Sequence, residues 1–417
     1  GLFSAVFGLA SIVGPLLGGY LTDNLSWRWV FYVNLPVGVV ALTVLWLFYR
    51  DSGPRRAARS IDYGGALTLS AGVVPLLLAL SWGGTQYAWG SVPIVGLFVT
   101  ALVMLAAFVW TELHAAEPIM PLSLFRNRVL TVCALGIGIV GMALFGTILY
   151  IPLFVQGVIG TTATQSGTVL TPMMFAMIGS SIIGGQLIAR TGKYKLLALG
   201  GLVATAAGMF LLAGMGPGTD YTTTVRNMVV IGIGLGPVMP VFTLASQSAV
   251  RVDQIGVATS LTQFARSIGG TLGTAIFGSV LVNSFAPAFQ RALPAAAVTA
   301  IPSAQLEPFQ NPQALLNPQT ADTLQASFVA LGPQGLALYA TVLEAVKLAL
   351  SSSLHDVFLL GAGVAAVGVL VVMFLREVPL RGSQTATRAT EAGAVSSLPP
   401  VPARDEPVLI EDRRRAS

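Results

Sequence analysis

Charged side chains are scarce in this sequence. Asp, Glu, Lys and Arg make up 9% of the 417 residues, whereas a soluble domain carries roughly 25%. Because so few charges cannot cover a water-facing surface of this size, a soluble globular protein is excluded. The apolar fraction is 54% and the mean hydropathy is +0.78. Continuous apolar runs of about 20 residues predict a helical membrane protein rather than a barrel of alternating strands.

Cysteine and histidine are almost missing as well. The single Cys133 lies in an apolar run and cannot form an intrachain disulfide, so it indicates a small buried residue. His114 and His355 have no neighbouring metal ligands, so no metal site is predicted. An enzyme would need clustered His, Asp, Glu or Cys, and their absence leaves no catalytic residue to nominate. The net charge of +5 lies in loops and tail and does not predict a nucleic-acid partner.

Apolar runs bounded by charged residues predict ten transmembrane helices. Each run is long enough to cross a hydrocarbon core of about 30 Å at 1.5 Å per residue. The predicted fold is therefore an all-α integral membrane bundle. The expected spans are residues 2–22, 29–49, 63–81, 92–111, 129–155, 165–189, 196–215, 227–247, 256–282 and 357–375.

The distribution of positive charge predicts the orientation. Of the 22 Lys and Arg residues, 17 lie in one alternate set of loops and the C-terminal tail, four in the opposite set and one in a span. Excess Lys and Arg mark the cytoplasmic side. We therefore expect a multi-pass protein of the plasma (inner) membrane with a cytoplasmic C-terminus.

Two segments do not have the composition of spans. Residues 284–356 are rich in Pro, Gln and Ala and predict a long external connection, with an amphipathic helix at the outer surface near residues 335–353. The Pro-, Ser- and Arg-rich residues 377–417 predict a disordered cytoplasmic tail.

Glycine and proline occur together where a helix is required. The stretch Gly14-Pro15-Leu16-Leu17-Gly18-Gly19 places Gly14 and Gly18 four residues apart, a spacing that lets a neighbouring helix approach closely. Pro15 lacks an N–H and favours a kink. A closely packed, kinked helix is predicted here. The stretch GIGLGPVMP, residues 232–240, predicts a second, broken helix that lines a cavity.

Several motifs together resemble a known transporter family. The Gly-Pro stretch followed by SWRWVFYVNLPVG (residues 26–38) resembles the fifth and sixth helices of the drug:proton antiporters of the major facilitator superfamily, most closely the fourteen-helix branch of the EmrB/QacA type. Further similar stretches are IDYGG (61–65), EPIMPLSLFRNR (117–128), LYIPLFVQ (149–156), GGQLIARTGKYK (184–195) and RSIGGTLGTAIFG (266–278).

The resemblance implies a domain organisation and two groups of motif residues. The implied parts are the last two helices of an N-terminal bundle (1–50), a central extra helix pair with its loops (51–125), a C-terminal six-helix bundle with the external loop 284–356 (126–376), and the tail. The implied motif residues are Gly14, Pro15, Gly18 and Gly19 in the antiporter helix, and Asp62, Gly185, Arg190 and Gly192 in cytoplasmic loops. Ala5 and Ala189 depart from the family pattern. Ten helices instead of fourteen lead us to expect a chain that lacks four N-terminal helices.

Arg266 is the only charged residue inside the predicted span cores. A charge there costs at least about 2.5 kcal/mol unless it has a partner or a wet cavity. Two interpretations stay open: Arg266 contacts substrate or a carboxylate elsewhere in the protein, or it anchors helix packing through backbone carbonyls. Helical spacing places other small and polar residues on its face, and Gln156 is a further candidate beside an outer vestibule. The candidate cavity-facing residues are Arg266, Gln263, Thr262, Thr259 and Gln156, with Gly269, Gly270 and Gly273 on the same stripe.

The resemblance implies secondary active transport. The expected activity is proton-coupled efflux of amphipathic, cationic or neutral drug-like or antibiotic molecules by alternating access, with the lipid bilayer as surroundings and the proton gradient in place of a cofactor. The span cores hold no Asp, Glu or His, so the coupling carboxylate is expected upstream of Gly1. Alternatives are a dedicated exporter of one endogenous metabolite and a non-transporting structural or sensor relative. Whether a periplasmic adaptor extends the route is open.

Overall fold

The computed structural model describes residues 13–14, 17–18, 20–21, 25–26, 28–48, 62–84, 86–115, 118–120, 122–161, 163–302, 306–310, 318–329 and 334–377. Within these ranges the regular structure is helical, and strand-like pairing is limited to one isolated bridge between Gly83 and Tyr87. The all-α prediction is confirmed. Most of the predicted span 2–22 and nearly all of the predicted tail lie outside the described residues.

Nine helices in this part of the chain are long and apolar enough to cross a membrane. They coincide with the predicted spans from the second to the tenth. Their bounds are Trp29–Phe48 (α2, Trp29–Tyr32, with α3, Asn34–Phe48), Tyr63–Trp82 (α4), Val92–His114 (α5), Arg128–Ile159 (α6, Arg128–Phe154, with the π-turn η2, Val155–Ile159), Thr168–Thr191 (in α7, Ala163–Thr191), Lys195–Ala213 (α8), Tyr221–Ser248 (α9), Val252–Ala292 (η3, Val252–Gln254, with α10, Ile255–Ala292) and Gly335–Met373 (α14).

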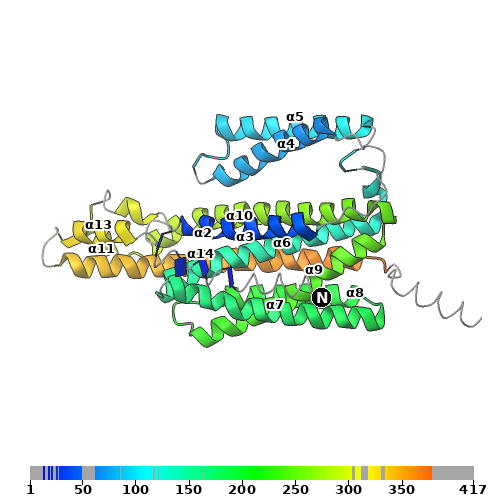
Figure 1. Ribbon diagram of the computed structural model, residues 1–417. Coiled ribbons are helices and arrows are strands. Elements are labelled where there is room, and N and C mark those ends of the chain that lie inside the picture. The colour runs from blue at the N-terminus through cyan, green and yellow to red at the C-terminus, as the bar shows by residue number, and fades with distance from the viewer. Residues whose placement is uncertain are drawn as a thin grey trace, which may run out of the picture. The chain divides into compact units, whose positions relative to one another are not determined.

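Six of these helices, α6 to α10 and α14, pack side by side as one bundle (Figure 1). Helix α9 contacts both α7 and α8 through its glycines. A Cβ on Gly232 would lie 3.1 Å from the Met173 carbonyl carbon, and a Cβ on Gly234 would lie 2.6 Å from the Thr205 nitrogen. In lipid, such close backbone approach supplies much of the helix–helix attraction.

The prediction of a broken helix at residues 232–240 is wrong. Helix α9 is continuous from Tyr221 to Ser248 although Pro237 and Pro240 lie inside it. Its glycines are buried against α7 and α8, and Val238 is fully buried. Glycine here permits contact between helices, and the surrounding bundle keeps the helix intact despite its prolines.

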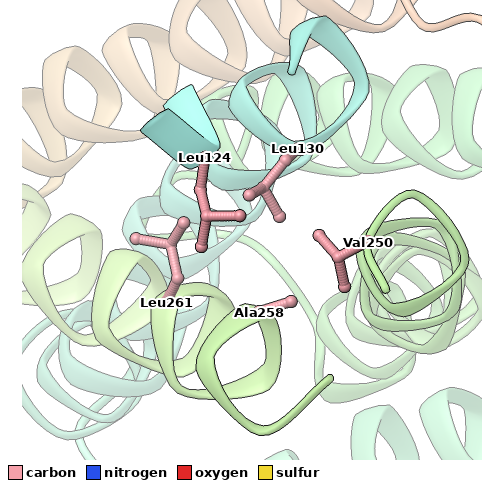
Figure 2. Close-up of a cluster of buried hydrophobic side chains, with 5 residues drawn as sticks. All are labelled: Leu124, Leu130, Val250, Ala258 and Leu261. Atoms are coloured by element: carbon pink, nitrogen blue, oxygen red, sulfur yellow. The ribbon is translucent and has the colours of Figure 1, made fainter. Parts of the chain in front are cut away.

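The start of the bundle is fixed by the turn η1 (Leu122–Arg126) and by Asn127. The Asn127 side chain accepts hydrogen bonds from the Val129 and Leu130 nitrogens at 3.0 and 3.4 Å, and so caps α6. It also donates to the Ala249 carbonyl at 2.7 Å, at the end of α9. An apolar cluster lies beside this cap and joins the starts of α6 and α10 to the end of α9 (Figure 2). Its members are Leu124, Leu130, Val250, Ala258 and Leu261.

Helices α10 and α14 are longer than a bilayer requires. They contain 38 and 39 residues, or about 57 Å each at 1.5 Å per residue. The extra length falls in the region predicted as a long external connection, residues 284–356. The surface helix expected near residues 335–353 is not separate, because it forms the first half of α14. The prediction of a helix over these residues is confirmed, its separation from the last span was wrong, and its place at the outer surface stays a prediction.

The remaining connection between α10 and α14, residues 293–334, carries its own apolar contacts. It includes α11 (Ala295–Ala300), η4 (Glu307–Gln310) and α13 (Pro318–Val329). The rings of Phe309, Phe328 and Tyr339 lie 5.5 to 6.3 Å apart, centroid to centroid. Phe309 and Phe328 are fully buried, so this aromatic cluster attaches the connection to the start of α14.

Candidate functional site

The rotation of α10 is set by its contact with α6. A Cβ on Gly269 would lie 2.6 Å from the Gly138 carbonyl carbon, and one on Gly273 would lie 2.7 Å from the Met142 Cα. A Cβ on Gly141 would meet the Arg266 carbonyl group. Because the two backbones touch along this face, α10 cannot turn without losing the contact. On another face of α10, Gln263 and Ser267 are exposed.

The open face of α10 carries a shallow pocket of about 420 Å³. Four of its five lining residues have hydroxyl or amide side chains and the fifth is aromatic. The lining residues are Thr259, Ser260, Gln263, Phe264 and Ser267. Sequence analysis named Thr259 and Gln263 but missed Ser260, Phe264 and Ser267. The recurrence of positions 259, 263 and 267 at intervals of four was the signal that could have identified Ser267.

Thr259 is part of a hydrogen-bonded link between α9 and α10. The Gln247 amide donates to the Thr259 hydroxyl at 2.9 Å, and this hydroxyl donates to the Ile255 carbonyl at 2.8 Å. One wall of the pocket is therefore attached to the end of α9, which restricts the Thr259 rotamer.

Arg266 lies at the border between the closed and open faces. It is 11 residues into α10, about 16 Å along the helix axis. Its side chain is half-buried, and Nε is buried with no hydrogen-bond partner. The ion pair found among the described residues joins Arg251 to Asp253, so no described carboxylate lies within 4 Å of the Arg266 guanidinium.

The predicted stripe around Arg266 is divided between the two faces. Thr262 is 3% exposed and donates to the Thr259 carbonyl at 2.8 Å, so it belongs to the buried side. Gly269, Gly270 and Gly273 face α6. Only Thr259 and Gln263 of the predicted stripe line the pocket. Residues at ±3, ±4 and ±7 from Arg266 cover a wider part of the α10 surface than the part that α6 leaves exposed.

Gln156 is not brought together with this group. It lies in the π-turn Val155–Ile159 that ends α6 and is half-buried. The start of α6 packs beside the start of α10, and Thr259 lies near that start. Gln156 therefore lies at the other end of the bundle from Thr259. The outer-vestibule role suggested for Gln156 stays a prediction.

The predicted basic loop motif joins α7 to α8 and attaches them to the end of α14. Gly192 has a left-handed φ of +67° and donates to the Ile188 carbonyl at 2.8 Å, which ends α7. Lys195 Nζ donates to the Met373 carbonyl at 2.8 Å. The buried Tyr194 donates to the Arg376 carbonyl at 3.2 Å. Arg190 is exposed and Gly185 is half-buried.

The other motif residues are only partly visible. Asp62 caps α4 by accepting a hydrogen bond from the Gly65 nitrogen at 2.7 Å. Nothing lies within 4 Å of a Cβ placed on Gly14 or Gly18, so the close contact expected there is not seen for these two residues. Pro15 and Gly19 lie outside the described residues. Among the residues that the structure describes, no group of three or more His, Cys, Asp or Glu could hold a metal ion.

Comparisons with known proteins identify the family. The family description "Major Facilitator Superfamily" matches residues 1–274. The chain is 38% identical over 413 residues to the multidrug transporter protein MdtP of Bacillus subtilis, covering 95% of this chain and 73% of MdtP.

Two further relatives are longer than this chain. The uncharacterized MFS-type transporter Rv1877 of Mycobacterium tuberculosis is 37% identical over 382 residues, covering 91% of this chain and 51% of that protein. Multidrug resistance protein 3 of B. subtilis is 39% identical over 285 residues, covering 68% of this chain and 55% of that protein. The chain thus matches about half the length of these two relatives. With its apolar helices and these similarities, the chain belongs to the major facilitator superfamily of multi-pass membrane transporters.

Proposed function

We propose that the protein is a proton-coupled efflux transporter of drug-like or antibiotic amphipathic small molecules. The observation that carries this proposal is the exposed face of α10, where a shallow, amphipathic pocket of about 420 Å³ lies next in sequence to an arginine deep in a transmembrane helix. A ligand pocket of drug size has a volume in this range. The names of MdtP and multidrug resistance protein 3 support efflux as the direction of transport.

Alternating access is supported by the rigidity of the six-helix bundle. The α6–α10 and α7–α9 contacts are backbone to backbone, and the Lys195 and Tyr194 hydrogen bonds attach α8 to the end of α14. A bundle held in this way moves as one body. Rocking of one such body against another around a midplane site is the mechanism that this architecture favours.

The fourteen-helix branch and the orientation belong to the same proposal. The apolar helices α4 and α5 pack on each other and precede the six-helix bundle, as the central extra pair of that branch would. The excess of Lys and Arg in one set of loops and in the tail favours an inner-membrane protein with its C-terminus in the cytoplasm. The coupling carboxylate is proposed to lie upstream of Gly1, because the predicted span cores hold no Asp, Glu or His.

Transport into everted membrane vesicles tests the function. The protein is expressed from its complete reading frame, and uptake of a fluorescent amphipathic dye is followed after a proton gradient is imposed. We expect uptake that stops when an uncoupler collapses the gradient. Uptake that is indifferent to the uncoupler would contradict proton coupling, and vesicles without protein-dependent uptake would favour a structural or sensor role. Competition by several unrelated drugs would separate multidrug efflux from export of one metabolite.

A further inference from the structure

We propose that Arg266 binds an acidic group, a carboxylate in the simplest case, on the transported molecule, so that the substrates of this protein include amphipathic anions. This inference rests on the proposed transport function and deepens it, because it names the chemical class that the pocket on α10 selects. It revises the expectation of cationic or neutral substrates.

The charge of Arg266 lacks a counterion among the described residues. Its Nε is buried without a hydrogen-bond acceptor, and the ion pair found in that part of the chain is Arg251 with Asp253, at the start of the helix. A guanidinium is a planar fork of N–H donors that stays charged and matches a carboxylate with two parallel hydrogen bonds. An uncompensated cation at this depth repels a cationic ligand and favours an anionic one.

Arg266 is next to the pocket along α10, although it is not one of the residues that line it. Helical side chains lean towards the N-terminus, over the residues three and four positions earlier. For Arg266 those are Thr262 and Gln263, and Gln263 lines the pocket. The contact of Gly141 with the Arg266 carbonyl group prevents α10 from rotating the side chain away.

The rest of the pocket suits an amphipathic anion. The hydroxyl of Ser267 and the amide of Gln263 are hydrogen-bond donors one position and three positions from Arg266. The ring of Phe264 lies on the same wall and offers an apolar surface. One charged donor, several neutral donors and one aromatic ring are the groups that an aromatic acid requires.

A carboxylate could also come from the protein itself, outside the described residues. A carboxylate of the ligand and a carboxylate of the protein can be distinguished by comparing two ligands that differ only in whether they carry a free carboxylate. Rhodamine 110 carries a free carboxylate, and rhodamine 123 is the methyl ester of the same ring system. Only a carboxylate on the ligand makes the effect of an Arg266 variant depend on which of these two dyes is bound.

The experiment measures the binding of both dyes to the purified protein, expressed from its complete reading frame, by fluorescence polarisation. We expect the wild-type protein to bind rhodamine 110 more tightly than rhodamine 123. Arg266→Gln should weaken binding of rhodamine 110 by about 10- to 100-fold and change binding of rhodamine 123 by less than about threefold. Arg266→Lys should restore part of the preference. Arg291→Gln makes the same chemical change near the exposed end of α10 and should alter neither dye.

Three results would overturn the inference. Equal loss of both dyes in a folded Arg266→Gln protein would assign Arg266 to a carboxylate of the protein or to helix packing. No change in either dye would leave it without a role in binding. Absence of rhodamine 110 binding to the wild-type protein would contradict recognition of a ligand carboxylate. The vesicle assay is read separately, because uncoupler-sensitive transport of rhodamine 123 with no binding of rhodamine 110 keeps the proposed function and rejects only this inference.

Discussion

Helices α9 and α10 are both rich in glycine, yet the bundle uses them differently. In α9 the glycines contact α7 on one side and α8 on the other, so the middle of the helix is enclosed. In α10, Gly269, Gly270 and Gly273 contact α6, and the face that carries Thr259, Gln263 and Ser267 stays open. In both helices, therefore, glycines lie where another helix packs closely. The candidate functional face of α10 is the face without these glycine contacts.

The largest effect is expected in the enclosed helix. A Cβ on Gly236 would meet the Met177 carbonyl group and the Ser180 hydroxyl, so Gly236→Val should destabilise the bundle by about 3 kcal/mol or more. Thermal unfolding in detergent measures the change. Gly200→Val is the matched control, since nothing lies within 4 Å of a Cβ there. An equal loss of thermal stability in both variants would show that the helix propensity of valine, rather than packing against α7, controls stability.

A smaller loss is expected on the closed face of α10. Gly269→Ala places a methyl group against the Gly138 backbone and should cost about 1 to 3 kcal/mol. Because it separates α6 from α10, transport should fall together with the melting temperature. Ala at Gly256, which has open space around it, is the control. A Gly269→Ala protein of unchanged stability would contradict the close contact.

The open face should show the reverse behaviour. Gln263→Ala should leave the melting temperature unchanged, because the residue is exposed, while losing about one hydrogen bond to substrate, or roughly two- to tenfold in KM. Transport kinetics and unfolding are measured on the same preparation. If the variant loses stability while KM stays constant, Gln263 contributes to helix packing and not to substrate binding.

The smallest effect is expected at the end of α14. The Lys195 ammonium group lies against the Met373 carbonyl, where a cation stabilises the end of a helix by about 0.3 to 1 kcal/mol. Lys195→Met should lower stability by that amount. The difference in stability between the variant and the wild-type protein should shrink in high salt, which screens the interaction. Lys193→Met in the exposed loop is the control. Identical melting temperatures for all three proteins would show that the Lys195–Met373 hydrogen bond does not contribute to stability.

Much of the fold followed from composition and hydropathy, since nine predicted spans coincide with apolar helices. The depth of Arg266 in α10 also followed, because it depends only on position along one helix. The division of its stripe did not, because the burial of Thr262 and the exposure of Ser267 depend on where neighbouring helices pack, which helical spacing alone does not give. The continuity of α14 was missed because the helical spacing near residues 335–353 was interpreted as an isolated element. Lys195 was counted as a loop charge, and its acceptor is 178 residues away.

The central claim is that the open face of α10 meets substrate in a wet cavity rather than lipid. The most direct measurement is the rate at which Ser267→Cys reacts with a water-soluble thiol reagent, in a protein whose buried Cys133 is replaced by Ser. Ile276→Cys, at an exposed apolar position of the same helix, is the control. We expect fast reaction at position 267 that substrate slows, and little reaction at position 276. Equal reactivity at both positions, or no protection by substrate, would contradict the claim.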